Sequence, residues 1–213
     1  LAGSVRAYAT RYGVAAGNNI AVFTNNDSGW QTAVELVSKG INVTAVIDPR
    51  DTTPRAHLPG VAIIMGASVC DTQGRKALNR ITLTNGQVIN VDCLAVSGGW
   101  SPNVHLTCHQ RGRPVWNDEI AGFVPGGNLP VGQSIAGASN GAMTLGAAVK
   151  SGHKTANAIL KELGFKPSRS QAPKAEDESF AIKQYWHVAG YKQRAWIDLQ
   201  NDVTSKDVKQ SQA

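Results

Sequence analysis

The fold is decided by the stretch Ile20-Ala21-Val22-Phe23-Thr24-Asn25-Asn26-Asp27-Ser28-Gly29, in which a short apolar run enters a polar turn. The run at residues 20–24 is typical of a buried parallel strand, and the turn offers N-cap side chains for a helix. That helix has apolar residues at helical spacing and ends at Gly40. A second apolar run, Val43 to Ile47, follows it. This strand–helix–strand order predicts two parallel strands joined by a right-handed crossover.

Other segments add to this sheet. Helical spacing at residues 5–12, with Gly13 as a stop, predicts a helix before the first strand. Apolar runs at residues 61–65 and 93–97 predict two further buried strands.

An antiparallel excursion is expected between these last two strands. Residues 80–84 and 87–91 read as strands on either side of Asn85-Gly86. This pair favours a type I′ turn, because both residues accept positive φ angles. The sequence therefore predicts an α/β fold, in which a Rossmann-like parallel sheet is interrupted by an antiparallel β hairpin.

The C-terminal part divides into a helix and an extended segment. Small and apolar residues from Asn140 to Leu163 predict a long helix that stops at Gly164. Residues 165–179 are polar and contain Pro and Lys, as linkers do. We therefore predict a nucleotide-binding lobe at residues 1–164, including a return segment to another lobe. Residues 165–213 would form a linker and the start of a further domain.

Composition excludes several classes of protein. The 213 residues carry a net charge of +6, but Lys and Arg are scattered without a basic stripe, so no nucleic-acid partner is expected. No apolar run approaches the roughly 20 residues of a membrane span, and no export signal is visible, so we predict a cytoplasmic protein with no membrane contact. The three cysteines are too few and too widely spaced for a disulfide framework or a CxxC pair.

The polar turn is the first candidate site, for a dinucleotide. A GxGxxG motif lets a pyrophosphate approach the amides at a helix N-terminus. Overlaid here, it retains only its third glycine, Gly29, whereas Asn26 adds a side chain and Asp27 adds negative charge. A structural turn and a nucleotide site are equally favoured on these residues. The candidate cofactor contacts are Thr24, Asn25, Asn26, Asp27, Ser28 and Gly29.

Asp48 extends this candidate site. It follows the second strand, 19 residues after Gly29 (48 − 29), where an acid would bind an adenosine ribose and repel a 2′-phosphate. This position favours NAD over NADP. Alternatively, Asp48-Pro49 simply opens a turn.

A second candidate element lies further along the chain. The strand that ends at Ser97 and the turn at Gly98 resemble the segment that leads from the nicotinamide lobe back to the flavin lobe in two-dinucleotide-fold flavoproteins. The segment Ser134 to Gly141 resembles the Ala-Gly-Asp element that touches the first nucleotide in two-dinucleotide-fold flavoproteins, and it makes Gly137 and Asn140 candidate contacts. Because Ala138 replaces the acid, one expected hydrogen bond to a flavin ribitol is missing. These residues therefore favour NAD over FAD as the bound dinucleotide.

No catalytic or metal site is expected. The five histidines, His57, His105, His109, His153 and His187, show no metal-ligand pattern such as HExxH. No Ser lies in a GxSxG elbow, and Cys108 and His109 are neighbours in sequence only.

Specific strings resemble the alpha-subunit family of heterotetrameric sarcosine oxidases. They are Ala7-Tyr8, Arg11 to Gly17, Val22 to Ser28, Gly98 to Leu106, Arg113 to Trp116 and Ala195 to Thr204, and they follow the family's order almost from end to end. The resemblance implies an NAD-binding lobe of the pyridine nucleotide-disulfide oxidoreductase type. It also implies that an N-terminal dinucleotide lobe and a C-terminal folate-binding domain lie outside this chain.

The resemblance further implies an activity for the parent complex. That complex would demethylate sarcosine to glycine, with tetrahydrofolate as one-carbon acceptor and hydrogen peroxide as product. It would hold FAD in the beta subunit, FMN near the alpha–beta junction and NAD in the alpha subunit. The chain alone should be inactive, and its aromatic tail, Tyr185 to Thr204, should pack on partner domains or subunits. The alternatives are a ligand-free scaffold or regulatory lobe of another flavin-dependent amine or amino-acid dehydrogenase, and a complete NADH-dependent reductase.

Overall fold

The computed structural model describes residues 1–213 except 53–57, 168, 192–193, 199 and 213. The described residues form two compact units. The first unit comprises Leu1–Asn25, Gly29–Ser97 and Tyr185–Ala213, and the second comprises Asn26–Ser28 and Gly98–Gln184. The predicted division into residues 1–164 and 165–213 stays a prediction.

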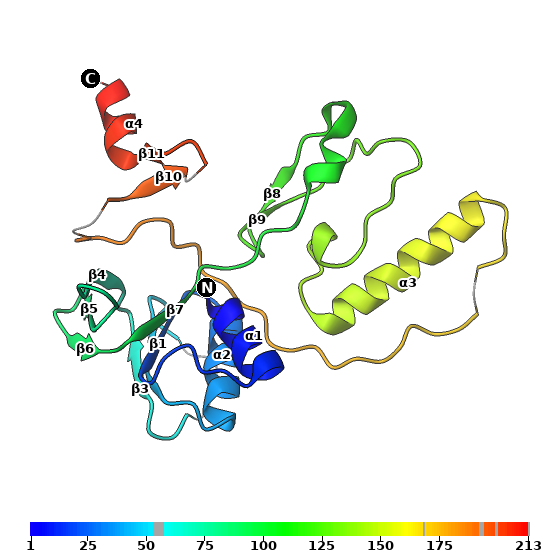
Figure 1. Cartoon of the computed structure of the whole chain (residues 1–213). Helices are drawn as coiled ribbons and strands as arrows, with labels where there is room; N and C mark the ends of the chain where they lie inside the picture. The colour runs from blue at the N-terminus through cyan, green and yellow to red at the C-terminus, as the bar shows by residue number, and fades with distance from the viewer. Residues whose placement is uncertain (53–57, 168, 192–193, 199, 213) are drawn as a thin grey trace. The chain divides into compact units, whose positions relative to one another are not determined.

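The first unit contains a four-stranded parallel sheet (Figure 1). Its strands are β1 (Ile20–Thr24), β2 (Val43–Asp48), β3 (Ala62–Met65) and β7 (Cys93–Ser97), in the order β3-β2-β1-β7. Strand β1 pairs in parallel with both β2 and β7, so it lies inside the sheet. The predicted parallel strands are therefore confirmed, and the interior position explains why β1 is a continuous apolar run. The predicted burial of the strand at residues 61–65 is wrong, because β3 lies at the edge of the sheet and its residues are exposed or half-buried.

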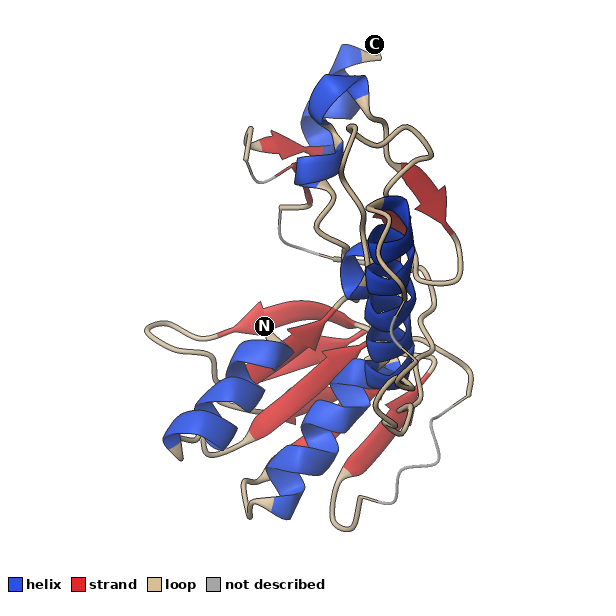
Figure 2. Ribbon diagram, turned by 90° about the vertical axis from the view of Figure 1, so that its right-hand side faces the viewer, coloured by secondary structure: helices blue, strands red, loops and turns tan. Residues whose placement is uncertain are grey.

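Two helices cover one face of this sheet. Helices α1 (Ala2–Tyr12) and α2 (Asp27–Ser38) run side by side along it (Figure 2). Alternate residues of a strand point to opposite faces, and Ile20 and Val22 accordingly join a core with the buried residues of both helices. Trp30 of α2 is the largest buried side chain in that core.

An antiparallel sheet packs on the opposite face. It consists of β4 (Val69–Gln73), β5 (Arg80–Leu83) and β6 (Val88–Asn90), in that order. Ile81 and Leu83 of β5 share a core with Ala21 and Ile47 of the parallel sheet. The predicted β excursion is confirmed, but it has a third strand, β4, that the sequence did not predict.

The predicted type I′ turn at Asn85-Gly86 is wrong. Only Gly86 has a positive φ, 86°, and Asn85 is not among the residues with positive φ. The Gly86 amide donates to Leu83 O, and Leu83 N donates to Gln87 O, so three residues form the loop. A three-residue loop needs the left-handed conformation only at its last residue, which is Gly86.

The second unit has little regular structure apart from one long helix. It contains the hairpin β8 (Val115–Asn117) and β9 (Gly122–Val124), the 3₁₀ turns η1 (His105–Thr107), η2 (His109–Arg111) and η3 (Gly137–Asn140), and helix α3 (Leu145–Glu162). The long helix predicted from Asn140 begins five residues later. Gly141 is left-handed with a φ of 83°, and Thr144 is the N-cap, so the helix cannot start earlier.

The C-terminal residues of the first unit form a small separate element. Strands β10 (Trp196–Asp198) and β11 (Val203–Thr204) pair in antiparallel fashion before helix α4 (Ser205–Ser211). Thr204 and Asp207 form a reciprocal capping box at the start of α4. Within the described parts of the chain, no helix has the length and hydropathy needed to cross a membrane.

Candidate functional site

The polar turn predicted as a nucleotide site is short and buried. Strand β1 ends at Thr24 and helix α2 begins at Asp27, so two residues connect them. The side chains from Thr24 to Asp27 are each at most 6% exposed, and Ser28 is half-buried. These side chains are shielded from solvent. A bound pyrophosphate, in contrast, would need access to the turn.

Gly29 allows the close contact between strand and helix that was expected of the motif's third glycine. A Cβ atom added to Gly29 would overlap Oγ1 and Cβ of Thr24. The first turn of α2 therefore lies directly against the end of β1, and no larger residue fits at position 29.

The first residues of α2 are engaged by a later segment, residues 175–182, which we call the strap. The Asp27 carboxylate accepts hydrogen bonds from Ser179 Oγ at 2.5 Å and from the Ala181 amide at 3.0 Å. The Asp27 amide donates to Ala181 O at 3.0 Å, and Asn26 forms an isolated antiparallel bridge with Ile182. The Asp27 amide, one of the groups that would face a phosphate, is thus bound to the chain itself.

Asp48, the candidate ribose ligand, is fully buried at the end of β2. Its Oδ2 accepts from Trp30 Nε1 at 2.8 Å and from Arg50 Nη2 at 2.8 Å. Its Oδ1 accepts from the Arg50 amide at 2.9 Å and from Arg50 Nε at 3.1 Å. Both carboxylate oxygens are therefore satisfied, and a ribose hydroxyl could reach Asp48 only by displacing Trp30 or Arg50.

Sequence reasoning missed the partners of Asp48. Trp30 has the spacing of a core residue of α2, and its position gives no sign that its indole nitrogen bonds a strand end 18 residues later. Arg50 lies two residues beyond Asp48 and could have been noticed as an available cation. The donors around Asp48 are groups of the chain itself, as is typical of a carboxylate with a structural role.

The other candidate residues lie in the second unit. Gly98 follows β7 directly, and a Cβ added there would meet no atom within 4 Å. Gly137 has a φ of 69°, and its amide donates to Ser151 Oγ of α3 at 3.1 Å. Asn140 ends η3 and lines a pocket beside α3. Of the ten candidates, Thr24, Asn25, Gly29 and Asp48 belong to the first unit.

The start of α3 has a carboxylate that the sequence did not indicate. Asp177 of the strap accepts from Thr144 Oγ1 at 2.6 Å and from the Ala147 amide at 3.1 Å. The hydrogen bond from the Thr144 hydroxyl is the main reason that the pKa of Asp177 is lowered. Gly146 is buried beneath the strap, and a Cβ there would lie 2.5 Å from Asp177 Oδ1. Because Asp177 follows Thr144 by 33 residues, no local sequence pattern predicts its contact with the start of α3.

Three of the five histidines have separate partners. His105 Nδ1 lies 2.8 Å from Asn103 Oδ1, and His153 Nε2 lies 2.9 Å from Asn157 Nδ2. The His187 ring contacts Tyr191, whereas His57 lies outside the described residues. In the described ranges, no group of three His, Cys, Asp or Glu side chains is placed to hold a metal ion.

Comparison with solved structures defines the class of the fold. The chain superposes on L-proline dehydrogenase from P. horikoshii with a TM-score of 0.57 and 17% identity, covering 76% of this chain and 29% of that one. It also superposes on the bacillithiol disulfide reductase Bdr from Staphylococcus aureus with a TM-score of 0.50 and 18% identity, covering 68% of this chain and 51% of that one. The chain therefore has the Rossmann-like fold of the pyridine nucleotide-disulfide oxidoreductase type, as predicted.

Sequence comparison then narrows the class. No family model matches the chain. It is 38% identical over 214 residues to the sarcosine oxidase alpha subunit of Rhizobium meliloti (strain 1021) and 33% identical over 235 residues to that of Corynebacterium sp. (strain U-96). Each match covers 98% of this chain but only 22% and 24% of the relative. The predicted resemblance to sarcosine oxidase alpha subunits is confirmed, and the chain spans about a quarter of their length.

Proposed function

We propose that this chain is a portion of the alpha subunit of a cytoplasmic, heterotetrameric sarcosine oxidase. The similarity over 98% of the chain is the observation that carries the proposal. The parent complex would convert sarcosine to glycine, pass the one-carbon unit to tetrahydrofolate and reduce oxygen to hydrogen peroxide. Its partners would be the remaining domains of the same subunit and the other subunits, which supply FAD and part of the FMN site.

Within that subunit, this lobe would serve as a scaffold. The complete pairing of Asp48 with Trp30 and Arg50 supports this role, because a ribose would have to break buried, charge-assisted hydrogen bonds. The bonding of Asp27 to the strap supports it also. NAD would be bound mainly by the N-terminal lobe, and Gly98, Gly137 and Asn140 would lie at the edge of that site.

The exposed tail supports a role in assembly. Trp186 is 71% exposed and Ile197 is 60% exposed, although such side chains are costly to leave in water. The tail from Tyr185 to Thr204 would bury them on a neighbouring domain or subunit.

The proposal is tested on the full-length subunit that contains this chain. It would be tagged, purified with its natural partners, and assayed for peroxide formation with sarcosine, dimethylglycine and proline. We expect flavin-containing partner subunits to copurify and sarcosine to be the best substrate. Turnover of proline without turnover of sarcosine would instead support the alternative, another flavin-dependent amino-acid dehydrogenase.

A further inference from the structure

The chain contains two Asn-Gly pairs, Asn85-Gly86 and Asn140-Gly141. In such a pair the backbone nitrogen of the glycine can attack the side-chain amide carbon of the asparagine, because glycine has no Cβ atom to hinder the approach. The two pairs have the same local chemistry. The structure around each pair therefore decides how readily it reacts.

Asn85-Gly86 lies in the loop between β5 and β6. Residues 84–87 are all exposed, so water reaches both members of the pair. The hairpin contributes Ile81 and Leu83 to the core of the first unit, whereas none of residues 84–87 belongs to that core. A covalent change in the loop therefore leaves the packing of the hairpin in place.

The side-chain amide of Asn85 is held by a single neighbour, Gln87. Asn85 Oδ1 accepts a hydrogen bond from the Gln87 backbone amide at 3.0 Å, and Asn85 Nδ2 donates to Gln87 Oε1 at 3.0 Å. The first bond closes a small ring that contains both Cγ of Asn85 and the nitrogen of Gly86, so the two reacting atoms stay close together. The Gln87 amide also donates to the oxygen on which negative charge develops during the attack.

The attacking nitrogen must first be released from its own hydrogen bond. The Gly86 amide donates to Leu83 O at 2.9 Å. This bond closes an exposed loop at the end of a short hairpin, and bonds in such loops open by local fluctuation without unfolding of the core.

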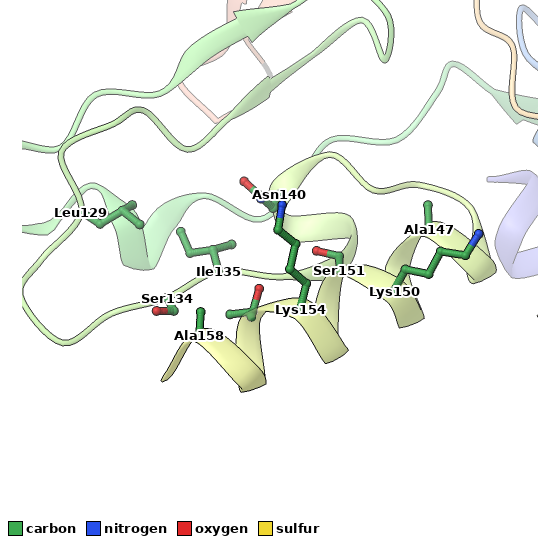
Figure 3. A pocket seen from close by; sticks show the side chains of 10 residues that line it. Leu129, Ser134, Ile135, Asn140, Ala147, Lys150, Ser151, Lys154 and Ala158 are labelled. Carbon is green, nitrogen blue, oxygen red and sulfur yellow. The ribbon is translucent and has the colours of Figure 1, made fainter. Parts of the chain in front are cut away.

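Asn140-Gly141 has a different environment. Asn140 ends the 3₁₀ turn η3 and lines the pocket beside α3 (Figure 3). Within the described part of the chain, its side-chain oxygen accepts no hydrogen bond. The Gly141 amide donates to Ala138 O at 3.0 Å, so its nitrogen is engaged as that of Gly86 is. The pair therefore lacks the donor that would stabilise the charge on the attacked amide.

We propose that Asn85 is a site of spontaneous modification, at which the side-chain amide becomes an acid. The Gly86 nitrogen loses its proton to solvent and bonds to Cγ of Asn85. The bond from Cγ to Nδ2 then breaks, and ammonia leaves with a proton taken from water. Water opens the resulting cyclic imide at either carbonyl and gives aspartate or isoaspartate. The reaction consumes one water, releases one ammonia and involves no oxidation.

The proposal is independent of the assignment to sarcosine oxidase. The reacting residues and their partners lie in the first unit, within the range Gly29–Ser97. They need no cofactor and no second protein, so either proposal can fail alone.

The test follows both Asn-Gly peptides in the full-length subunit that contains this chain. The folded protein is incubated in mildly alkaline buffer and digested at intervals, and the amide, aspartate and isoaspartate forms are quantified by mass spectrometry. We expect Asn85 to be converted at least about tenfold faster than Asn140, since loss of one donor to a developing oxyanion has at least that effect. In urea the two rates should be similar, because the two pairs are then equivalent.

Asn85→Gln is the matched control. It keeps a side-chain amide but moves the amide carbon one bond further from the Gly86 nitrogen, so conversion should fall at least about tenfold. The proposal is overturned if Asn85 reacts no faster than Asn140 in the folded protein. It is also overturned if Asn85 stays unmodified in the folded protein while the sample in urea reacts completely. The second outcome concerns Asn85 alone, so it does not depend on what binds near Asn140.

Discussion

The indole Nε1 of Trp30 donates a 2.8 Å hydrogen bond to Oδ2 of Asp48, and both side chains are at most 2% exposed. The bond joins the helix after β1 to the end of β2, the two elements that would hold the pyrophosphate and ribose of a dinucleotide. In this chain the carboxylate at the end of β2 is hydrogen-bonded by the chain's own side chains. The Arg50 guanidinium adds a bidentate ion pair, in which Nε donates to Oδ1 and Nη2 donates to Oδ2 of Asp48.

This triad should be a stability element. Asp48→Asn removes the buried negative charge that pairs with the Arg50 guanidinium, whose side chain is 9% exposed. We expect the free energy of unfolding to fall by about 3 to 5 kcal/mol, as for a broken buried ion pair. Urea unfolding followed by circular dichroism measures it.

Asp202→Asn is the matched control for that change, since it removes a carboxylate from an exposed position. Its left-handed backbone, with a φ of 56°, also suits Asn. The control should change stability by no more than about 0.5 kcal/mol. Equal effects of the two substitutions would mean that the triad contributes nothing specific.

Gly29→Ala tests the contact between β1 and α2. Alanine is favoured over glycine in a helix by about 1 kcal/mol, so propensity alone predicts stabilisation. Overlap with Thr24 predicts the opposite, a loss of about 1 to 3 kcal/mol from overpacking. Gly98→Ala, which meets open space, should be nearly neutral in the same thermal unfolding assay. A stabilised Gly29→Ala variant would contradict the close packing.

Asp177 should make the start of α3 sensitive to pH. Because its pKa is lowered in the folded chain, its stabilising contribution is fully present above its ordinary value of 3.8. That contribution is lost as the pH falls through the lower folded value. The hydrogen-exchange protection factor of the Ala147 amide, which donates to Asp177, should therefore fall when the pH drops from 6 to below 3.

Two comparisons make that measurement specific. Asp177→Ala should lower the protection of Ala147 and remove its pH dependence, leaving only the Thr144 hydroxyl as acceptor, whereas Glu178→Ala should behave as the unaltered chain. The Ala156 amide in the middle of α3 reports whether the helix itself survives at acid pH. If Asp177→Ala leaves the protection factor of Ala147 equal to that of the unaltered chain, the strap adds nothing to the cap that the Thr144 hydroxyl provides.

The sequence predicts those parts of the fold that local patterns determine. Apolar runs identify β1 and β2, and their burial follows from the position of β1 between two parallel partners. The Asn-Gly pair located the hairpin but predicted the wrong turn, because loop length is fixed by the register of β5 and β6 and not by two residues.

The candidate site depends on contacts that no local pattern contains. A degenerate glycine motif left a structural turn and a nucleotide site equally favoured. The features that support a structural turn are the pairing of Asp48 with Trp30 and the bond from Ala181 to Asp27, which is 154 residues distant in sequence. The motif shows that glycines expected at a nucleotide site are missing. It does not show which side chains of the chain bond to Asp48 and Asp27.

The most direct test of the closed turn is the indole Hε1 resonance of Trp30 during titration with NAD. The five tryptophans give few such signals, and Trp30→Phe assigns the relevant one. Because this proton lies on the Asp48 carboxylate, it reports occupancy of the ribose position even if NAD binds elsewhere on the chain. We predict that its chemical shift stays unchanged at millimolar NAD. A saturable shift of this resonance would show that a nucleotide reaches Asp48, and would contradict the account of a structural lobe.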